Sequence, residues 1–178
     1  VYKSWAFKEL RERMLAGVVN RGQVGYAPPG WTTLVDHLRG LGHSDQAMID
    51  AGVATASTGN VIDLMRDRMM FPIRDPEGDL VGFTGRCAAG AEKVDRGPDR
   101  SPTPKYINTP ATPLFRKSQV LYGLDAGADA LAGGAWPVLV EGPLDRWAVA
   151  LEADTHKIPI VPLATCGTAL TSEHLRVL

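Results

Sequence analysis

Cysteine, net charge and long apolar segments are all scarce in this sequence. Its 178 residues include two cysteines, Cys87 and Cys166, and no CxxC pair. This usage excludes a zinc ribbon and a disulfide framework, and it favours a reducing cytoplasm. The longest run without a charged residue, 158–172, contains two prolines. It falls short of the ~18 residues that suggest a membrane span. We therefore expect a cytoplasmic protein that binds no zinc and no membrane.

The signatures of several enzyme classes are also absent. There is no GxxxxGK[ST] loop, no GxGxxG after a strand, no HExxH and no GxSxG. The four histidines are scattered, so we interpret them as surface or structural residues. Cys166 follows an apolar run, but no histidine is spaced to activate it as a nucleophile. The chain begins with Val1 and has no signal peptide, so we expect it to be trimmed or cut from a longer protein.

The charge that is present is unevenly distributed. The net charge of −1 excludes a protein that is basic throughout. Between residues 96 and 117, however, Asp99 is the one acidic residue among five basic ones. A basic face of this kind can bind a polyanion, although charge alone favours a solvated loop with spare charge. The basic residues are Arg96, Arg100, Lys105, Arg116 and Lys117.

The first part of the chain predicts short helices followed by a β-hairpin. Apolar residues recur at helical spacing near the N-terminus, and the prolines and glycine of residues 25–30 must end that helix. Two apolar runs around a turn that contains proline and glycine predict the hairpin. We expect, in order, a helix over 4–16, a helix capped by Thr32 or Thr33, a helix capped by Ser44, strands at 69–73 and 80–85, and a loop over 88–104.

The last third of the chain predicts alternating strands and helices. Residues 136–140 are apolar throughout, which is typical of a buried parallel strand. Pro143 suits the first turn of the next helix, and Thr171 suits the cap of the last one. The result is a parallel βαβα unit, whose ligands bind at the carboxyl ends of its strands. Two strands make a small sheet, so we expect the rest of this domain to lie outside the chain.

Two carboxylates follow the first of these strands. Glu141 comes directly after the strand, Gly142 permits a tight turn, and Asp145 lies one helical turn further on. Paired carboxylates at a strand end suit Mg²⁺, and Glu141 could instead act as a general base. The alternative is that both merely stabilise a helix N-terminus.

A second group of residues suits a nucleic acid or a nucleotide. Lys105 and Lys117 can neutralise phosphates, Tyr106 can stack on a base, and Asn108 can bond a sugar or phosphate oxygen. A structural turn around Tyr106 and Asn108 is the alternative. Three arginines near the hairpin form a cationic patch if neighbouring strands carry them, and are ordinary surface residues otherwise. These are Arg66, Arg68 and Arg86.

Seven short motifs occur in order along the chain. They are Gly25-Tyr-Ala-Pro-Pro-Gly-Trp31, Arg66-Asp-Arg-Met-Met-Phe-Pro-Ile-Arg-Asp75, Val81-Gly-Phe-Thr-Gly-Arg86, Pro104-Lys-Tyr-Ile-Asn-Thr-Pro110, Leu121-Tyr-Gly-Leu124, Val140-Glu-Gly-Pro-Leu-Asp145 and Gly167-Thr-Ala-Leu-Thr171. Together they resemble the RNA polymerase core of bacterial DnaG-type primases. Each motif is weak alone, whereas the ordered set is highly specific, and it covers the chain from about residue 25 to its end.

The resemblance implies a fold and an activity. The fold is an α+β basic N-terminal subdomain over residues 1–120, followed by an incomplete α/β toprim unit over 121–178. The activity is synthesis of short RNA primers on a single-stranded DNA template from ribonucleoside triphosphates with Mg²⁺ or Mn²⁺, through an RNA–DNA hybrid. A replicative helicase is expected as a partner only through regions outside this chain.

The resemblance also implies roles for individual residues. Glu141 looks like the toprim glutamate, a general base or metal partner, and Asp145 matches the acidic residue that follows it. The other matching positions are associated with nucleic acid, nucleotide and catalysis, and Arg66 and Arg68 fall in the family's basic strand motif. The full set of site residues is Arg66, Arg68, Arg86, Lys105, Tyr106, Asn108, Lys117, Glu141 and Asp145, with Lys105, Lys117, Glu141 and Asp145 as the catalytic candidates.

Departures from the family pattern leave alternatives open. The downstream Asp-x-Asp of toprim domains is absent, no zinc ribbon precedes the core, and residues 88–104 form an unusually long insertion. We therefore expect a catalytic core that is inactive alone, of phage or mobile-element type. The alternatives are a primase-derived module that binds single-stranded DNA without catalysis, and another toprim enzyme. The segment around Lys105 and the hairpin argue against the last, because they lie outside toprim.

Overall fold

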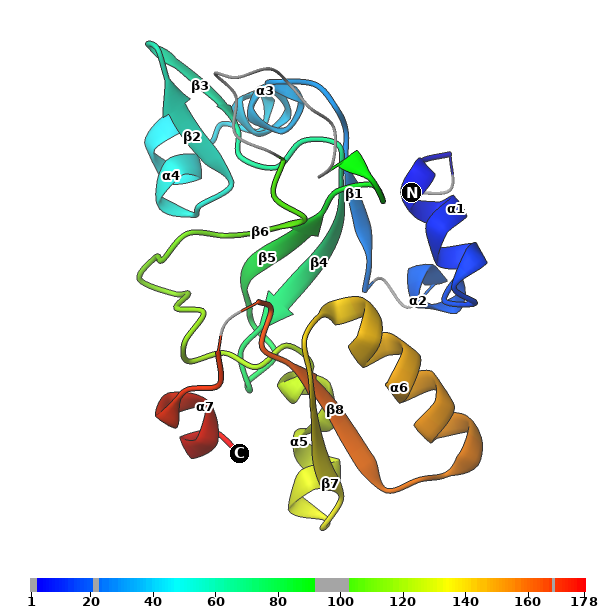
Figure 1. The fold of residues 1–178 in the computed structure, drawn as a ribbon. Coiled ribbons are helices and arrows are strands. Elements are labelled where there is room, and N and C mark those ends of the chain that lie inside the picture. The colour runs from blue at the N-terminus through cyan, green and yellow to red at the C-terminus, as the bar shows by residue number, and fades with distance from the viewer. Residues whose placement is uncertain (1–2, 21–22, 92–102, 168) are drawn as a thin grey trace. The chain divides into compact units, whose positions relative to one another are not determined.

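The computed structural model describes residues 3–20, 23–91, 103–167 and 169–178 (Figure 1). Arg96, Asp99 and Arg100, and most of the expected loop over 88–104, lie outside the described residues. The chain divides into two compact units: unit 1 comprises Val1–Phe71 with Phe83–Thr112, and unit 2 comprises Pro72–Gly82 with Pro113–Leu178. The units interleave along the sequence, and the division into domains at residue 120 stays a prediction.

The helices of unit 1 are short and begin close to the predicted caps. They are α1 (Trp5–Glu12), α2 (Gly17–Asn20), α3 (Thr33–Gly40) and α4 (Asp45–Asp50). Ser44 caps α4 as predicted, because its hydroxyl accepts a hydrogen bond from the amide of Ala47 at 3.2 Å. The N-terminus of α3 is capped from a distance: the buried carboxylate of Asp63 accepts from the amides of Leu34 and Val35 at 2.8 and 2.9 Å.

A four-stranded sheet in the order β1-β4-β5-β6 and a separate two-stranded sheet complete this part of the fold. The predicted hairpin is confirmed as β4 and β5, and its tip, residues 72–82, belongs to unit 2. The sequence did not predict β1, the β2–β3 hairpin or β6. The strands are β1 (Gly25–Ala27), β2 (Ala54–Ser57), β3 (Asn60–Asp63), β4 (Arg68–Arg74), β5 (Leu80–Arg86) and β6 (Tyr106–Asn108).

Unit 2 contains the predicted alternation of strands and helices. Its elements are α5 (Leu124–Ala132), β7 (Trp136–Val140), α6 (Pro143–His156), β8 (Ile160–Ala164) and α7 (Ser172–Arg176). β7 and β8 pair in parallel, with Val140 opposite Ala164 at their carboxyl ends. The predicted βαβα unit is therefore confirmed, and Pro143 and Thr171 occupy the expected positions at the starts of α6 and α7.

The core of unit 2 forms where α5 and α6 pack against β8. Leu121, Leu124, Val161 and Leu163 are buried together. Gly127 lets α5 approach β8 closely, because a Cβ at that position would lie 2.2 Å from the Cγ1 atom of Val161. Within the described residues, no helix is both long enough and apolar enough to cross a membrane.

Candidate nucleic-acid interface and catalytic site

Arg68 holds the segment that leads into β6. Arg68 is 3% exposed, and its guanidinium donates to the main-chain carbonyls of Gly85 and Pro104 at 2.9 Å and of Lys105 at 3.3 Å. The carbonyl of Lys105 also accepts from the amide of Cys87 at 3.0 Å. The main chain at Lys105 is thus fixed by buried groups, while its own side chain is exposed.

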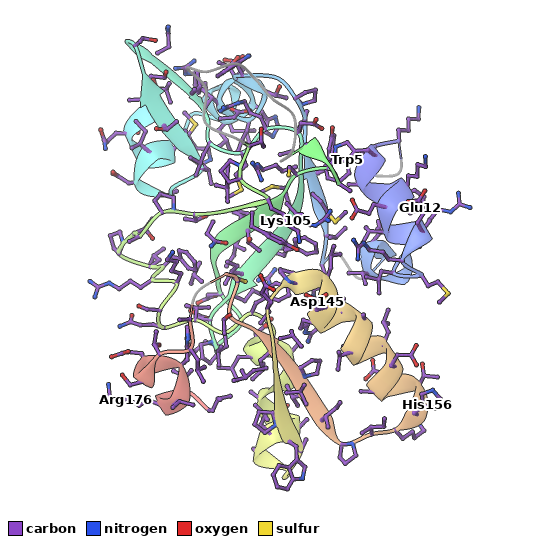
Figure 2. The ribbon with its side chains drawn as sticks, viewed as in Figure 1. Trp5, Glu12, Lys105, Asp145, His156 and Arg176 are labelled. Atoms are coloured by element: carbon purple, nitrogen blue, oxygen red, sulfur yellow. The ribbon has the colours of Figure 1, made fainter. Side chains whose placement is uncertain are left out.

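The side chains that follow Lys105 combine a cation with an aromatic ring. The ammonium nitrogen of Lys105 lies 5.9 Å from the ring centroid of Tyr106, and Lys105 is labelled in Figure 2. Tyr106 and Asn108 are half-buried in β6, where Tyr106 pairs with Arg86 and Asn108 pairs with Thr84 of β5. A strand edge with a cation and an aromatic face is suited to a phosphate and a stacked base.

Arg66 forms a second cation–aromatic pair, with Trp31. Its guanidinium carbon lies 4.3 Å from the centroid of the Trp31 ring, which is 64% exposed. Both residues are anchored: the carbonyl of Trp31 accepts from the amide of Asp63 at 2.8 Å, and Arg66 donates to the carbonyl of Asp63. Sequence reasoning did not select Trp31, although it closes the Gly25–Trp31 motif. Its partner lies far away in sequence, so no local pattern reports the pair.

Asp67, which lies between Arg66 and Arg68, joins its own segment to those of Trp5 and Tyr26 through hydrogen bonds. It adopts a left-handed conformation with φ +50°. One carboxylate oxygen accepts from the indole of Trp5 at 2.7 Å and from the hydroxyl of Tyr26 at 2.5 Å. Burial, followed by the neighbouring Asp67 carboxylate, raises the pKa of Tyr26 to about 12. The αL residue Asp67 lies between Arg66 and Arg68.

Arg86 is buried in an ion pair with α1. Its guanidinium lies 2.6 Å from the carboxylate of Glu9, and the two side chains are 5% and 12% exposed. The three arginines near the hairpin therefore have separate partners: Trp31 for Arg66, main-chain carbonyls for Arg68, and Glu9 for Arg86. They do not form the single exposed cationic patch that strand alternation suggested, because the αL residue between Arg66 and Arg68 breaks the alternation.

The two candidate acidic residues lie where the sequence predicts. Glu141 directly follows β7, Asp145 lies in the first turn of α6, and both side chains are exposed (Asp145 is labelled in Figure 2). Among the residues that the structure describes, no group of three or more His, Cys, Asp or Glu side chains could hold a metal ion. Two carboxylates supply at most part of the oxygen shell that Mg²⁺ requires.

Lys117 and Cys166, two further residues that the sequence analysis considered, both belong to unit 2. Lys117 is exposed and lies five residues before Tyr122, which forms an antiparallel β-bridge with Ala164. Cys166 is buried, and this burial raises the pKa of its thiol to about 12. A thiol that stays protonated near neutral pH is a poor nucleophile, which agrees with the interpretation of Cys166 as non-catalytic.

Comparison with known proteins identifies the family. The family model described as "DNA primase catalytic core, N-terminal domain" matches residues 5–128. The DNA primase of Streptomyces coelicolor is 42% identical over 155 residues, which cover 87% of this chain and 22% of that protein. This chain belongs to the bacterial DnaG primase family. It corresponds to the N-terminal region of the catalytic core.

Solved structures of primases share this mixed α/β fold. The RNA polymerase domain of Mycobacterium tuberculosis primase DnaG superposes with a TM-score of 0.78 at 33% identity, covering 96% of this chain and 52% of that one. A DnaG primase catalytic domain bound to single-stranded DNA gives a TM-score of 0.72 at 36% identity, covering 97% and 51%. The chain thus spans about half the length of these solved structures, and less of the curated relatives.

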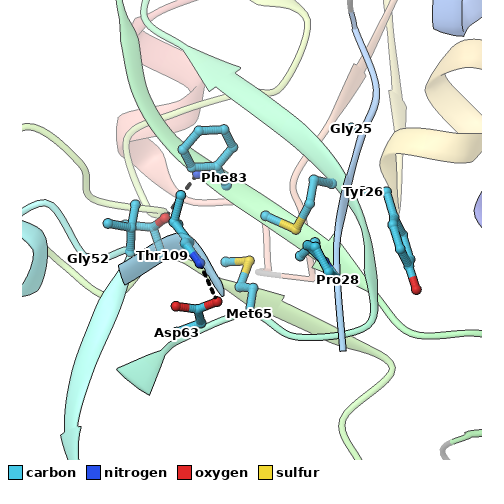
Figure 3. Close-up of a pocket in the computed structure, with 12 residues that line it drawn as sticks. Gly25, Tyr26, Pro28, Gly52, Asp63, Met65, Phe83 and Thr109 are labelled. Carbon is cyan, nitrogen blue, oxygen red and sulfur yellow. Dashed lines mark hydrogen bonds between the residues drawn. The ribbon is translucent and has the colours of Figure 1, made fainter. Parts of the chain in front are cut away.

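Unit 1 of this primase-family chain also contains an apolar pocket of about 270 Å³ (Figure 3). Its lining includes Pro28, Met65 and Phe83. The one carboxylate in the lining, Asp63, already accepts two amide hydrogen bonds from α3. The described lining offers no cation to a phosphate, so the pocket does not resemble a nucleotide site.

Proposed function

We propose that this chain supplies the template- and nucleotide-binding part of a primase catalytic core that makes short RNA primers on single-stranded DNA. The observation that carries the proposal is the exposed Lys105 beside the half-buried Tyr106, in a chain of the primase family. The buried Arg68 holds the main chain of this segment through the carbonyls of Pro104 and Lys105. A fixed cation beside an aromatic ring suits a phosphate and an adjoining base. A primase relative bound to single-stranded DNA supports the same choice of template.

The proposed roles follow from the exposure of each side chain. Lys105 and Lys117 are exposed and are assigned to phosphates of the template, of an incoming ribonucleoside triphosphate or of the RNA–DNA hybrid. Tyr106 and Asn108 are assigned to base and sugar contacts, and the exposed Trp31 with Arg66 to a second stacking position. Arg68 and Arg86 are buried, so they are assigned to holding the interface in shape rather than to contacting DNA.

Glu141 and Asp145 are proposed as the first acidic residues of a toprim domain. Their carboxylate oxygens are of the kind that Mg²⁺ or Mn²⁺ prefers, and such an ion would neutralise charge on transferring phosphates. Because two carboxylates form a partial site, further acidic ligands must come from outside the described residues. Glu141 is exposed and free to accept a proton from a primer hydroxyl. We propose that the chain alone does not synthesise primers.

The salt dependence of DNA binding tests the interface. The chain is titrated with a labelled oligodeoxythymidine at several salt concentrations, and the slope of log K against log salt counts the phosphate contacts. Lys105→Ala and Lys117→Ala should each weaken binding and reduce the slope by about 0.7, the value for one contact to a single strand. Lys8→Ala is the matched control, because Lys8 is 81% exposed on α1, pairs with Glu12 and is assigned no contact with DNA. Binding that is insensitive to salt, or equal losses in all three variants, contradicts the proposal.

The catalytic role of Glu141 requires a longer protein that includes the expected downstream acidic residues. With Mg²⁺ or Mn²⁺ and ribonucleoside triphosphates, this protein should make primers, and Glu141→Gln should abolish synthesis while leaving DNA affinity unchanged. Glu152→Gln is the control, because Glu152 is an exposed carboxylate on α6, the helix that follows Glu141, and it is paired with His156. Full synthesis by Glu141→Gln would refute the catalytic role.

The second candidate function is a primase-derived module that binds single-stranded DNA and leaves catalysis to another chain. It is favoured by the absence of a three-residue metal cluster among the described residues. A longer protein that binds DNA with the predicted salt slope but makes no primers would select this candidate.

A further inference from the structure

The main chain at Lys117 and Ser118 is held by two side chains from the start of α7. The hydroxyl of Thr171 donates to the carbonyl of Ser118 at 2.6 Å. The Nε2 atom of His174 lies 3.0 Å from the carbonyl oxygen of Lys117. These contacts bridge 53 and 57 residues of sequence within unit 2. Two successive carbonyl groups are therefore fixed from one short segment.

The donors and acceptors around His174 fix its tautomer. Its Nδ1 atom accepts from the amide of Thr171 at 3.2 Å, so Nδ1 carries no hydrogen. The carbonyl of Lys117 can only accept, so the hydrogen is on Nε2. The imidazole thus donates through Nε2 to the carbonyl of Lys117. In the same arrangement the hydroxyl of Thr171 accepts from the amide of His174 at 3.1 Å, which completes a capping box.

The burial of these groups contrasts with the exposure of the lysine. The imidazole of His174 is fully buried, whereas the side chain of Lys117 is exposed. Phe115, two residues before Lys117, is 2% exposed and anchors the segment on its other side. The lysine side chain is flexible, so fixing its main chain is what restricts its direction. Here the main chain of Lys117 is held on both sides.

We propose that His174 and Thr171 are positioning residues for Lys117, which fix its carbonyl and thereby the direction of its side chain toward phosphate. This inference rests on the proposed role of Lys117. The residues act without touching DNA or nucleotide, by lowering the conformational freedom that Lys117 loses on binding. A purely structural cap at α7 would instead stabilise the fold and leave phosphate binding unchanged.

Two substitutions of His174 separate these possibilities. His174→Gln can keep a donor near the position of Nε2, and so the contact with Lys117, while losing the Nδ1 acceptor. His174→Asn can keep an acceptor near the position of Nδ1, and so the cap, while losing the contact with Lys117. We expect His174→Asn to weaken binding of the 178-residue chain to oligodeoxythymidine toward the level of Lys117→Ala, and His174→Gln to restore most of the affinity.

A double-mutant cycle makes the test specific for Lys117. His174→Asn should weaken DNA binding in the wild-type background but should change it by less than about twofold in the Lys117→Ala background. Thr171→Val, which removes the hydroxyl at nearly constant volume, should show the same dependence on Lys117. If His174→Asn does not fold, Thr171→Val replaces it as the test variant. Ser44→Ala is the control, because it removes the cap of α4 without contacting Lys117.

The outcomes distinguish this inference from the proposed function. Equal losses of affinity in both backgrounds, or no loss in either, overturn the positioning role, while the effects of Lys105→Ala and Lys117→Ala alone still support the interface. If Lys117→Ala itself has no effect on affinity or salt slope, the assignment of Lys117 to phosphate is wrong and the positioning role falls with it. If Ser44→Ala also loses affinity for DNA, the losses in the His174 and Thr171 variants reflect lower stability alone. That result would also overturn the inference.

Discussion

Replacing Glu9 by alanine tests how α1 is attached to the rest of unit 1. The carboxylate of Glu9 lies 2.6 Å from Arg86 and 3.1 Å from Arg13. Arg86 is 5% exposed, so the substitution leaves a buried guanidinium without its carboxylate. Removing one partner of a buried ion pair costs about 3–5 kcal/mol. Arg86 retains a hydrogen bond to the carbonyl of Cys87 at 3.3 Å, so we expect a loss of about 3 kcal/mol in the free energy of unfolding.

Urea unfolding followed by circular dichroism measures this loss. Domains of this size have unfolding free energies of about 5–15 kcal/mol, so a loss of about 3 kcal/mol shifts the midpoint clearly. Glu12→Ala on the same helix is the matched control, because Glu12 is 65% exposed and lies 3.8 Å from Lys8. An exposed pair of this kind contributes at most about 0.5 kcal/mol. If the two variants differ by less than about 0.5 kcal/mol, the buried pair does not hold α1.

The same variant separates two roles for Arg86. If Arg86 serves to hold α1, Glu9→Ala lowers stability and leaves the affinity for single-stranded DNA unchanged. If Arg86 contacts nucleic acid, as the family resemblance implies, removal of the competing carboxylate frees a cation and raises the affinity. A rise in both affinity and salt slope would therefore overturn the structural assignment of Arg86.

Three further predictions use other features of the structure. The raised pKa of Tyr26, about 12, means that its contribution to stability is complete below about pH 10, the usual tyrosine pKa. That contribution is lost as the pH rises through about 12, so Tyr26→Phe should flatten the alkaline fall in urea midpoint. Cys166, with its thiol pKa raised to about 12 by burial, should resist alkylation at pH 8 in the native chain and react after unfolding. Gly127→Ala should destabilise unit 2 by about 1–3 kcal/mol through the clash with Val161, measured by urea unfolding, and Val161→Ala should relieve part of the loss.

The parts of the fold with strong local signals could be predicted from the sequence. The βαβα alternation follows from the apolar strand 136–140 and from Pro143, and both are local features of the chain. The caps Ser44 and Thr171 were likewise predictable, because a hydroxyl two or three residues before an amide is a local arrangement. The missed hairpin at 54–63 has few large apolar residues, and its turn depends on left-handed Thr58 and Gly59.

The contacts that Arg66 and Arg68 make could not be predicted in the same way. Arg66 and Arg68 are two residues apart, yet one stacks on an exposed indole and the other is buried. The difference depends on the αL conformation of Asp67 and on main-chain carbonyls 36 and 37 residues further along the chain. A guanidinium that donates to main-chain carbonyls has no sequence signature, because every residue supplies a carbonyl.

Both candidate catalytic lysines have the same arrangement within their own units. Each exposes its side chain while its main-chain carbonyl accepts a hydrogen bond from a buried side chain distant in sequence: Arg68 for Lys105 and His174 for Lys117. An exposed lysine loses rotamer freedom when it binds phosphate, and a fixed main chain removes part of the remaining entropic cost. The buried donors should therefore matter for binding although they touch no ligand. In a scan of substitutions, Arg68 and His174 should affect DNA affinity more than most exposed cations, and an interface inferred from exposure alone would omit them both.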